Sequence, residues 1–228
     1  MDSSTPPQAA APPGARPAPP PPLLGEPLPV ELMNTVWADR EGVYDALLDA
    51  GDLARWLRSV DTRFSPPLDL GGPEAAEASV PAPDRPSVER FRELRDALRR
   101  LAAVATRDTR PTAASPVPDL AAAVGAVNRA CAYAPTWSRL AWNEDEPPAR
   151  ADGSSYGPEA RALSRIAEET VQLFTGPDAA GLRACHAPGC VRYFVRAHPR
   201  REWCSAGCGN RARVARHYRR HHPGGAGA

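Results

Sequence analysis

The chain has 228 residues, and its 28 basic residues, all of them arginine, stand against 27 Asp and Glu to give a formal net charge of +1. No stretch approaches the roughly 18 consecutive apolar residues of a membrane helix, and the N-terminus lacks the basic start and apolar core of a signal peptide. We therefore expect a cytoplasmic protein without membrane contact, in which five cysteines do not build a disulfide framework.

Composition divides the chain into four parts. Residues 1–27 form a Pro- and Ala-rich tract that cannot bury enough apolar surface to offset its backbone entropy, so we predict a disordered tail. Residues 28–178 predict a mainly helical domain, residues 179–222 a metal-binding module, and residues 223–228 a flexible tail. The arginine and alanine bias is typical of a GC-rich bacterial genome, so arginine content alone says little about function.

Apolar periodicity places the elements of the helical domain. Residues 30–36 fit a short strand or the start of a helix. Residues 42–60 predict helix, with Asp52 capping a new segment after Gly51. A Pro- and Gly-rich loop is expected over 65–87. The remaining predicted elements are a helix over 87–105 capped by Ser87, helices over 117–132 and 158–175, and a strand within 136–142.

Four of the five cysteines have the spacing C-x4-C-x13-C-x3-C, which comprises Cys185, Cys190, Cys204 and Cys208. Two close pairs joined by a longer connector supply the tetrahedral thiolate set of structural zinc. We predict one structural Zn²⁺ held by these four ligands. Redox dithiols or another metal are the alternatives. Cys131, in an apolar run, is expected to be a small buried hydrophobe.

The metal module is predicted to be a treble-clef or ribbon-like arrangement. Strand-like alternation over 191–195, a turn at His198 and Pro199, and a return over 201–203 predict a hairpin between the cysteine pairs. Ser205 then caps a helix that ends before Pro223. A module of this size lacks a sufficient core, so its folding should require the metal. The fold class is thus mainly α with small β elements.

Positive charge is concentrated in this module. Residues 182–222 hold ten Arg and one acidic residue, a balance of +9, whereas the rest of the chain carries −8. Arg213, Arg216 and Arg220 share one face of the predicted helix, and His217 lies beside them. We predict that these four contact DNA, because arginine binds phosphates and reads guanine edges. The alternative is a solvated basic face.

Other residues of the helix have different expected roles. Val214 and Tyr218 lie on another face and are expected to pack on the hairpin. Asn210 and Arg211 sit one turn from the metal, where they are candidates for structural bonds to carbonyls or thiolates. In the N-terminal domain, Asn34 and Thr35 are candidates for a small-molecule site or for a helix cap or turn.

These residues also carry a family resemblance. The run Cys208-Gly209-Asn210-Arg211, preceded by Trp203-Cys204-Ser205, resembles the CGNR zinc finger. Leu32-Met33-Asn34-Thr35 and the run 52–57 resemble the ABATE domain that commonly precedes it, so the resemblance spans roughly 28–222. It implies a stress-induced transcription regulator that binds DNA through the finger. Arg196 and His198 stand where family members often carry Asp and Ser, which adds positive charge.

Two functions of different classes follow. The first is a DNA-binding transcription regulator, associated with the nucleoid, whose N-terminal domain forms a homodimer or senses a small-molecule ligand. The second is an adaptor whose zinc module docks an acidic protein partner. RNA binding through Tyr193 and Phe194 is a third. An enzyme is not expected, because the sequence holds no catalytic triad motif, phosphate loop or open metal site.

Overall fold

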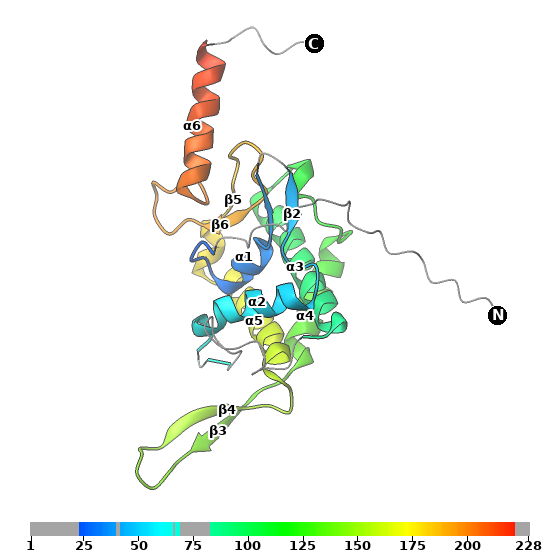
Figure 1. The fold of residues 1–228 in the computed structure, drawn as a ribbon, viewed down its shortest axis with the longest axis vertical. Coiled ribbons are helices and arrows are strands. Elements are labelled where there is room, and N and C mark those ends of the chain that lie inside the picture. The colour runs from blue at the N-terminus through cyan, green and yellow to red at the C-terminus, as the bar shows by residue number, and fades with distance from the viewer. Residues whose placement is uncertain (1–22, 40–41, 66, 69–82, 222–228) are drawn as a thin grey trace, which may run out of the picture.

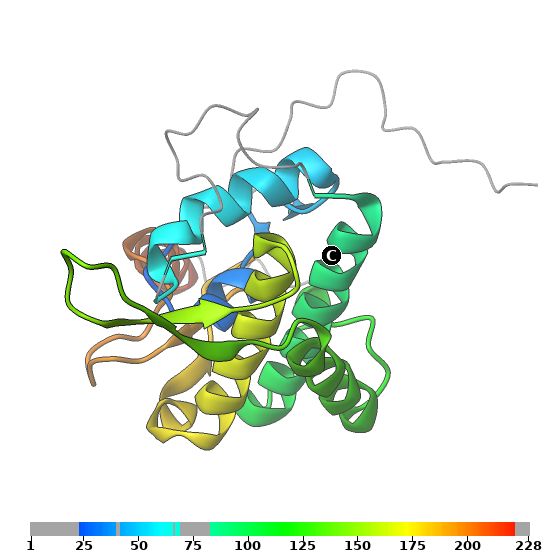
Figure 2. The ribbon, with the colours of Figure 1, turned by 90° about the horizontal axis from the view of Figure 1, so that it is seen from below.

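Three long helices form the body of the computed structural model, which describes residues 23–39, 42–65, 67–68 and 83–221. They are α3 (Arg85–Thr106), α4 (Leu120–Tyr133) and α5 (Pro158–Thr175). Figure 2 shows them packed together, with α2 (Ala50–Val60) crossing at one side. Their inward faces share one apolar core that includes Phe91, Leu98 and Ile166. Burial of these faces is what stabilises the helices in water.

Polar residues at the helix starts explain the helix boundaries. Asp84 caps α3 by accepting a 2.8 Å bond from the backbone N–H of Ser87, so α3 begins before the predicted cap. Ser87 instead donates through its hydroxyl to Glu159 at the start of α5. Asp119 caps α4 in the same way, by accepting a bond from the backbone N–H of Ala122. Helix α5 confirms the predicted helix over 158–175. Most of the predicted loop over 65–87 lies outside the described residues.

The N-terminal part differs from the prediction of a helix over 42–60. It contains α1 (Leu28–Met33), β1 (Val36–Ala38) and β2 (Val43–Asp45), and the two strands pair antiparallel. Helix α2 follows, and Asp49 rather than Asp52 caps it, through a 2.9 Å bond from the Asp52 N–H. Asp49 has the extended backbone that a cap requires, with φ of −143° and ψ of −178°.

A two-stranded ribbon projects from the end of the body opposite α6 (Figure 1). It consists of β3 (Trp137–Ala141) and β4 (Ala149–Gly153), which pair antiparallel, and it confirms the predicted strand within 136–142. The ring of Trp137 lies directly over Gly153, where a Cβ atom would come within 2.4 Å of the indole nitrogen. A side chain at position 153 would therefore displace the tryptophan ring.

The C-terminal elements are β5 (Leu182–Ala184), β6 (Tyr193–Val195) and α6 (Ala206–His221), with a 3₁₀ turn at Pro177–Gly181 before them. The predicted pairing of 191–195 with 201–203 is wrong: β6 pairs antiparallel with β5, which precedes the first cysteine pair. All three β6 residues are buried. Leu182, Tyr193 and Val195 belong to the same apolar core as α3 and α5, so burial decides the pairing.

Asn34 joins the helical body to β6. It ends α1, is buried, and its side-chain amide donates to the carbonyl of Tyr193 and accepts from the Tyr193 N–H, both at 2.9 Å. The Asn34 side chain thus makes the hydrogen bonds that a neighbouring strand would make at this edge of β6. Thr35 donates to the carbonyl of Leu32 at 2.8 Å. The Thr35 bond back to α1 is of the kind that the cap or turn interpretation predicts, whereas the Asn34 side chain bonds to β6 and not to α1.

Replacing Asn34 with alanine is expected to lower the free energy of unfolding by about 2–4 kcal/mol, because the N–H and carbonyl of Tyr193 both lose their partner inside the core. Urea denaturation followed by circular dichroism measures the change. Asn143→Ala, at the exposed tip of the ribbon, is the matched control and should leave the unfolding midpoint unchanged. Equal midpoints for the two variants would contradict this role of Asn34.

The described region begins before residue 28. Glu26 is buried, and one of its carboxylate oxygens accepts a 2.9 Å bond from the backbone N–H of Val195. Leu24 and Glu26 also donate backbone N–H bonds to Glu31. Residues 1–22 of the predicted disordered tail, and the predicted flexible tail 223–228, lie outside the described residues. Among the helices that the structure describes, none is long and apolar enough to cross a membrane.

Candidate metal centre and basic helix

Four cysteine sulfurs meet at the base of α6. The Sγ atoms of Cys185, Cys190, Cys204 and Cys208 all lie within 4.8 Å of one another, and no disulfide joins them. Cys190 and Cys204 are 3.8 Å apart, and Cys204 and Cys208 are 3.4 Å apart. Tetrahedral zinc with bonds of about 2.3 Å places its sulfur ligands roughly 3.8 Å from one another. The four side chains are buried and fit one structural zinc ion.

Each cysteine pair sits on a tight turn, called a knuckle below. The first knuckle, Cys185–Cys190, follows β5 and contains Gly189 in the left-handed region with φ of 71°, which favours glycine. Its turn is closed by a 2.9 Å bond from the N–H of Cys190 to the carbonyl of Ala187. The second knuckle, Cys204–Cys208, runs into α6. Ser205 accepts a 3.2 Å bond there from the N–H of Cys208, as predicted for the helix cap.

The four thiols shift one another's pKa through hydrogen bonds. These bonds lower the pKa of Cys185, to about 7, and that of Cys208, and they raise the pKa of Cys190 and of Cys204 above the usual range. Arg211 donates from Nη2 to the Cys208 sulfur at 3.0 Å, which places a positive charge beside the cluster. Four thiolates around one Zn²⁺ carry a net charge of −2, so this guanidinium offsets part of it. Asn210, the other residue of the predicted supporting pair, is exposed.

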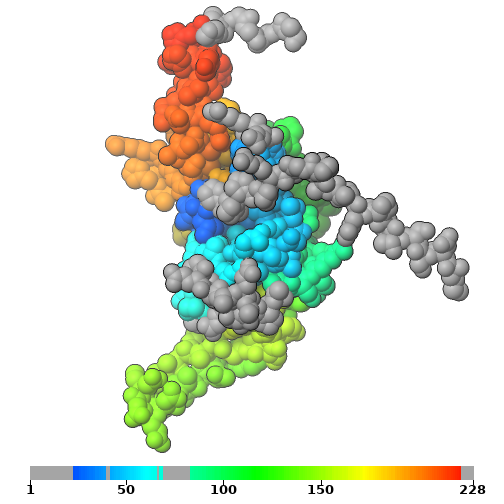
Figure 3. Space-filling model, viewed as in Figure 1, coloured from blue at the N-terminus to red at the C-terminus, as the bar shows by residue number. Residues whose placement is uncertain are grey.

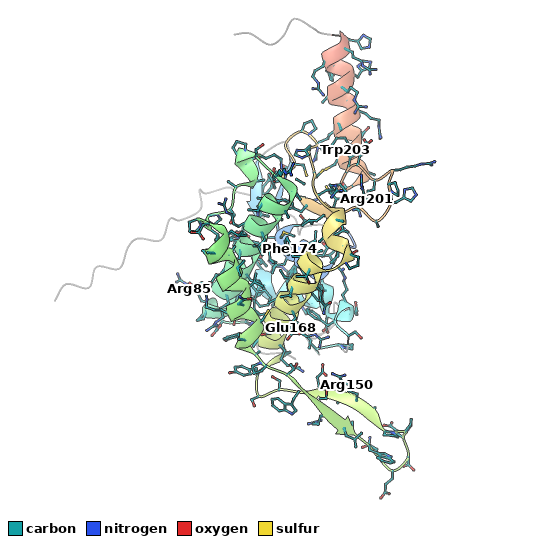
Figure 4. All side chains as sticks on the ribbon, turned by 180° about the vertical axis from the view of Figure 1, so that it is seen from behind. Arg85, Arg150, Glu168, Phe174, Arg201 and Trp203 are labelled. Atoms are coloured by element: carbon teal, nitrogen blue, oxygen red, sulfur yellow. The ribbon has the colours of Figure 1, made fainter. Side chains whose placement is uncertain are left out.

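Gly209 of the same motif makes room for Trp203. A Cβ atom at Gly209 would lie 3.1 Å from Cδ1 of the tryptophan ring, a tight contact at the foot of α6. Figure 4 shows Trp203 close to Arg201 beneath this helix. The small residue therefore lets the segment before the second knuckle pack against the first turns of α6, which fixes where the helix leaves the body.

Beyond these turns α6 stands clear of the body (Figure 3). Cys208, Gly209 and Ala212 are its buried residues. The predicted packing of Val214 and Tyr218 on the hairpin is wrong: their exposed fractions are 47% and 61%. The helix rises away from β6 instead of lying along it (Figure 1), so both side chains are largely exposed.

The four residues predicted to contact nucleic acid, Arg213, Arg216, His217 and Arg220, are all exposed on the projecting part of α6. Over residues 213–221 the helix carries four Arg and two His and no acidic residue. The ring centroids of His217 and His221 lie 4.3 Å apart on one side of the helix. The arrangement offers a positively charged rod with free access from solvent.

Two arginines outside the motif contact the knuckles and were not singled out from the sequence. Arg110 reaches the first knuckle from the helical body, and Arg201 reaches the second from the loop that precedes it. Arg110 is 75 residues away from Cys185, so no local pattern connects them. The only available signal was their residue type, in a chain where every basic residue is arginine.

Two family models match successive parts of the chain. The ABATE family model, described as "Putative stress-induced transcription regulator", matches residues 26–177. The CGNR zinc finger model matches residues 182–221, which include all four clustered cysteines and α6. No curated protein matches the sequence.

Proposed function

The chain belongs to the ABATE family, with a CGNR zinc finger behind the family domain, and on this premise we propose that it regulates transcription by binding DNA through α6. The observation that carries the proposal is the projecting half of α6, an exposed helix with four Arg and no acidic residue. The major groove of DNA, about 12 Å wide, admits one helix. The zinc ion would fix the base of this helix on the body.

Arg213, Arg216, His217 and Arg220 are the proposed contact residues. Arginine forks pair with phosphate oxygens and, in the groove, with guanine edges. Together with Arg219, the helix brings enough charge to neutralise about four phosphates, which makes the affinity depend steeply on salt. The zinc–thiolate cluster lies at the opposite, buried end of the helix and does not compete for these contacts.

One finger of this size buries only about 600–1,000 Å² on DNA, which limits its specificity. We therefore propose that two copies act together on two half-sites, and that the helical body provides the dimer contact or senses a small-molecule ligand. Measuring the mass of the protein in solution with and without an operator-length duplex tests this point. A single copy bound per specific site would contradict it.

Replacing Arg216 and Arg220 together with alanine is expected to weaken duplex binding about tenfold or more at physiological salt. The slope of log K against log salt should fall by about two, since each arginine accounts for about one phosphate. Zinc content should stay at one per chain. The matched control is Arg55→Ala with Arg85→Ala, two exposed arginines of the helical body. If both double variants lose the same affinity for the duplex, the assignment of DNA binding to α6 is wrong.

The adaptor function remains the second candidate, and the exposure of Val214 and Tyr218 favours it. These side chains give the projecting helix an apolar side, as in helices that lie in a groove of a protein partner. The same variants separate the two functions. Val214→Ser with Tyr218→Ser should spare duplex affinity if α6 binds DNA through its arginine face, whereas an adaptor would lose its protein partner.

A further inference from the structure

Both knuckles of the metal centre are held through their backbone by arginine side chains. Arg110 donates from Nη1 to the carbonyl oxygens of Cys185 and Cys190, each at 2.7 Å. Arg201 donates from Nη2 to the carbonyl oxygen of Cys204 at 3.1 Å and from Nη1 to that of Val195 at 3.1 Å. Three of the four sulfur-bearing residues thus have their backbone carbonyl bonded to a guanidinium group.

Each of these arginines is paired with a buried carboxylate of the helical body. Asp108 accepts from Arg110 at Nε and Nη2, at 2.8 and 2.7 Å, and its side chain is 2% exposed. Glu26 accepts from Arg201, and its side chain is also 2% exposed. The two charge-assisted bonds between Asp108 and the planar guanidinium of Arg110 fix the orientation of that group, which a single neutral bond does not.

The two carboxylates are themselves anchored to β6, the strand between the knuckles. The hydroxyl of Tyr193 donates to Asp108 at 2.7 Å, and the N–H of Val195 donates to Glu26 at 2.9 Å. Arg110 also lies over the Tyr193 ring, at 5.4 Å from its centroid. Each chain of contacts therefore runs from the helical body through a carboxylate and an arginine to the backbone of a metal ligand.

From this geometry we propose that the pairs Arg110–Asp108 and Arg201–Glu26 are positioning residues that hold the four thiols in place for zinc and so set its affinity. Some residues orient the metal ligands without binding the metal themselves. Removing such a residue typically lowers metal affinity about 10- to 100-fold. By the reciprocity of linked equilibria, zinc binding in turn stabilises the part of the helical body that carries Asp108 and Glu26.

The test measures zinc release from the zinc-loaded full chain into excess 4-(2-pyridylazo)resorcinol, followed by absorbance. Arg110→Gln and Arg201→Gln are expected to release zinc about tenfold faster or more than the unaltered chain. Arg95→Gln is the matched control, because Arg95 is even more buried and is also paired, with Asp45 at 2.6 Å and Asp96 at 2.9 Å, yet lies outside the knuckle contacts. It should lower the melting temperature without accelerating release.

A purely structural role predicts a different pattern. If Arg110→Gln and Arg201→Gln release zinc no faster than Arg95→Gln at a comparable loss of melting temperature, the proposal is wrong. Should Arg110→Gln fail to fold, Asp108→Asn replaces it: the guanidinium stays but loses its charged partner, and release should still accelerate. Unchanged release in Asp108→Asn would then overturn the proposal for the first knuckle.

Discussion

Cys204→Ser is expected to abolish stoichiometric zinc binding and to unfold the segment from the first knuckle to the end of α6. Three thiolates and a hydroxyl hold Zn²⁺ far less strongly than four thiolates, and structural zinc contributes on the order of 10–16 kcal/mol to folding of a small module. The Cys204 sulfur lies 3.8 Å from that of Cys190 and 3.4 Å from that of Cys208, so its loss opens both knuckles.

The loss should extend beyond the finger. Tyr193 and Val195, between the knuckles, are part of the main core, and Asn34 bonds to β6. Zinc analysis and hydrogen exchange are the measurements, with faster exchange expected in β5, β6 and α1. Cys131→Ser is the matched control, because Cys131 is half-buried in α4 and away from the cluster. It should retain one zinc; retention of one zinc by Cys204→Ser would refute the ligand set.

Replacing Arg99 with leucine is expected to cost about 3 kcal/mol or more of unfolding free energy. The buried guanidinium donates to three backbone carbonyls, those of Met33 and Val191 at 3.2 Å and Ala113 at 3.1 Å. Each carbonyl left unpaired in the core costs roughly 1–3 kcal/mol. Arg99 thereby joins α1, α3 and the segment between the knuckles, and its removal disturbs all three.

Thermal unfolding monitored by circular dichroism measures the effect. The neighbouring residue supplies the control: Arg100 also lies on α3 but is partly exposed and donates to one carbonyl, that of Pro118 at 3.0 Å. Arg100→Leu should shift the midpoint only slightly. A shift in Arg99→Leu as small as that in Arg100→Leu would show that these buried hydrogen bonds contribute little to stability.

Features that depend on neighbouring residues could be predicted from the sequence. The cysteine spacing identifies the metal cluster, and the helix over 158–175 follows from Pro158, its apolar stripe and Gly176. The cap at Ser205 also follows from local chemistry. Each of these requires only that a few consecutive residues agree, so one sequence suffices.

Features that depend on distant partners could not be predicted in this way. Asn34 and Tyr193 are 159 residues apart, and no period or spacing links them. The pairing of β6 with β5 depends on burial against α3 and α5, which favours it over the pairing suggested by the turn at Pro199. The choice of Asp49 over Asp52 as a cap depends on where β2 ends. In the first two cases, contacts between residues that are distant in the sequence determine the structure.

The exposed face of α6 shows a different limit. The sequence places Arg213, Arg216 and Arg220 on one face of α6, and all three are exposed. Exposure is expected both for a solvated face and for a DNA-binding face. Val214 and Tyr218 were expected to be covered because apolar residues on a helix usually face a core. In this chain α6 extends beyond the helical body from which it starts, so Val214 and Tyr218 are exposed instead of facing a core.

The measurement that tests DNA binding most directly is fluorescence anisotropy of a labelled mixed-sequence duplex, titrated with zinc-loaded full-length protein at about 50 and about 150 mM salt. If α6 neutralises about four phosphates, the affinity should fall roughly 50-fold between these two salt concentrations. Absence of binding even at the lower salt would contradict the account and would leave the zinc centre as a scaffold for docking a protein partner.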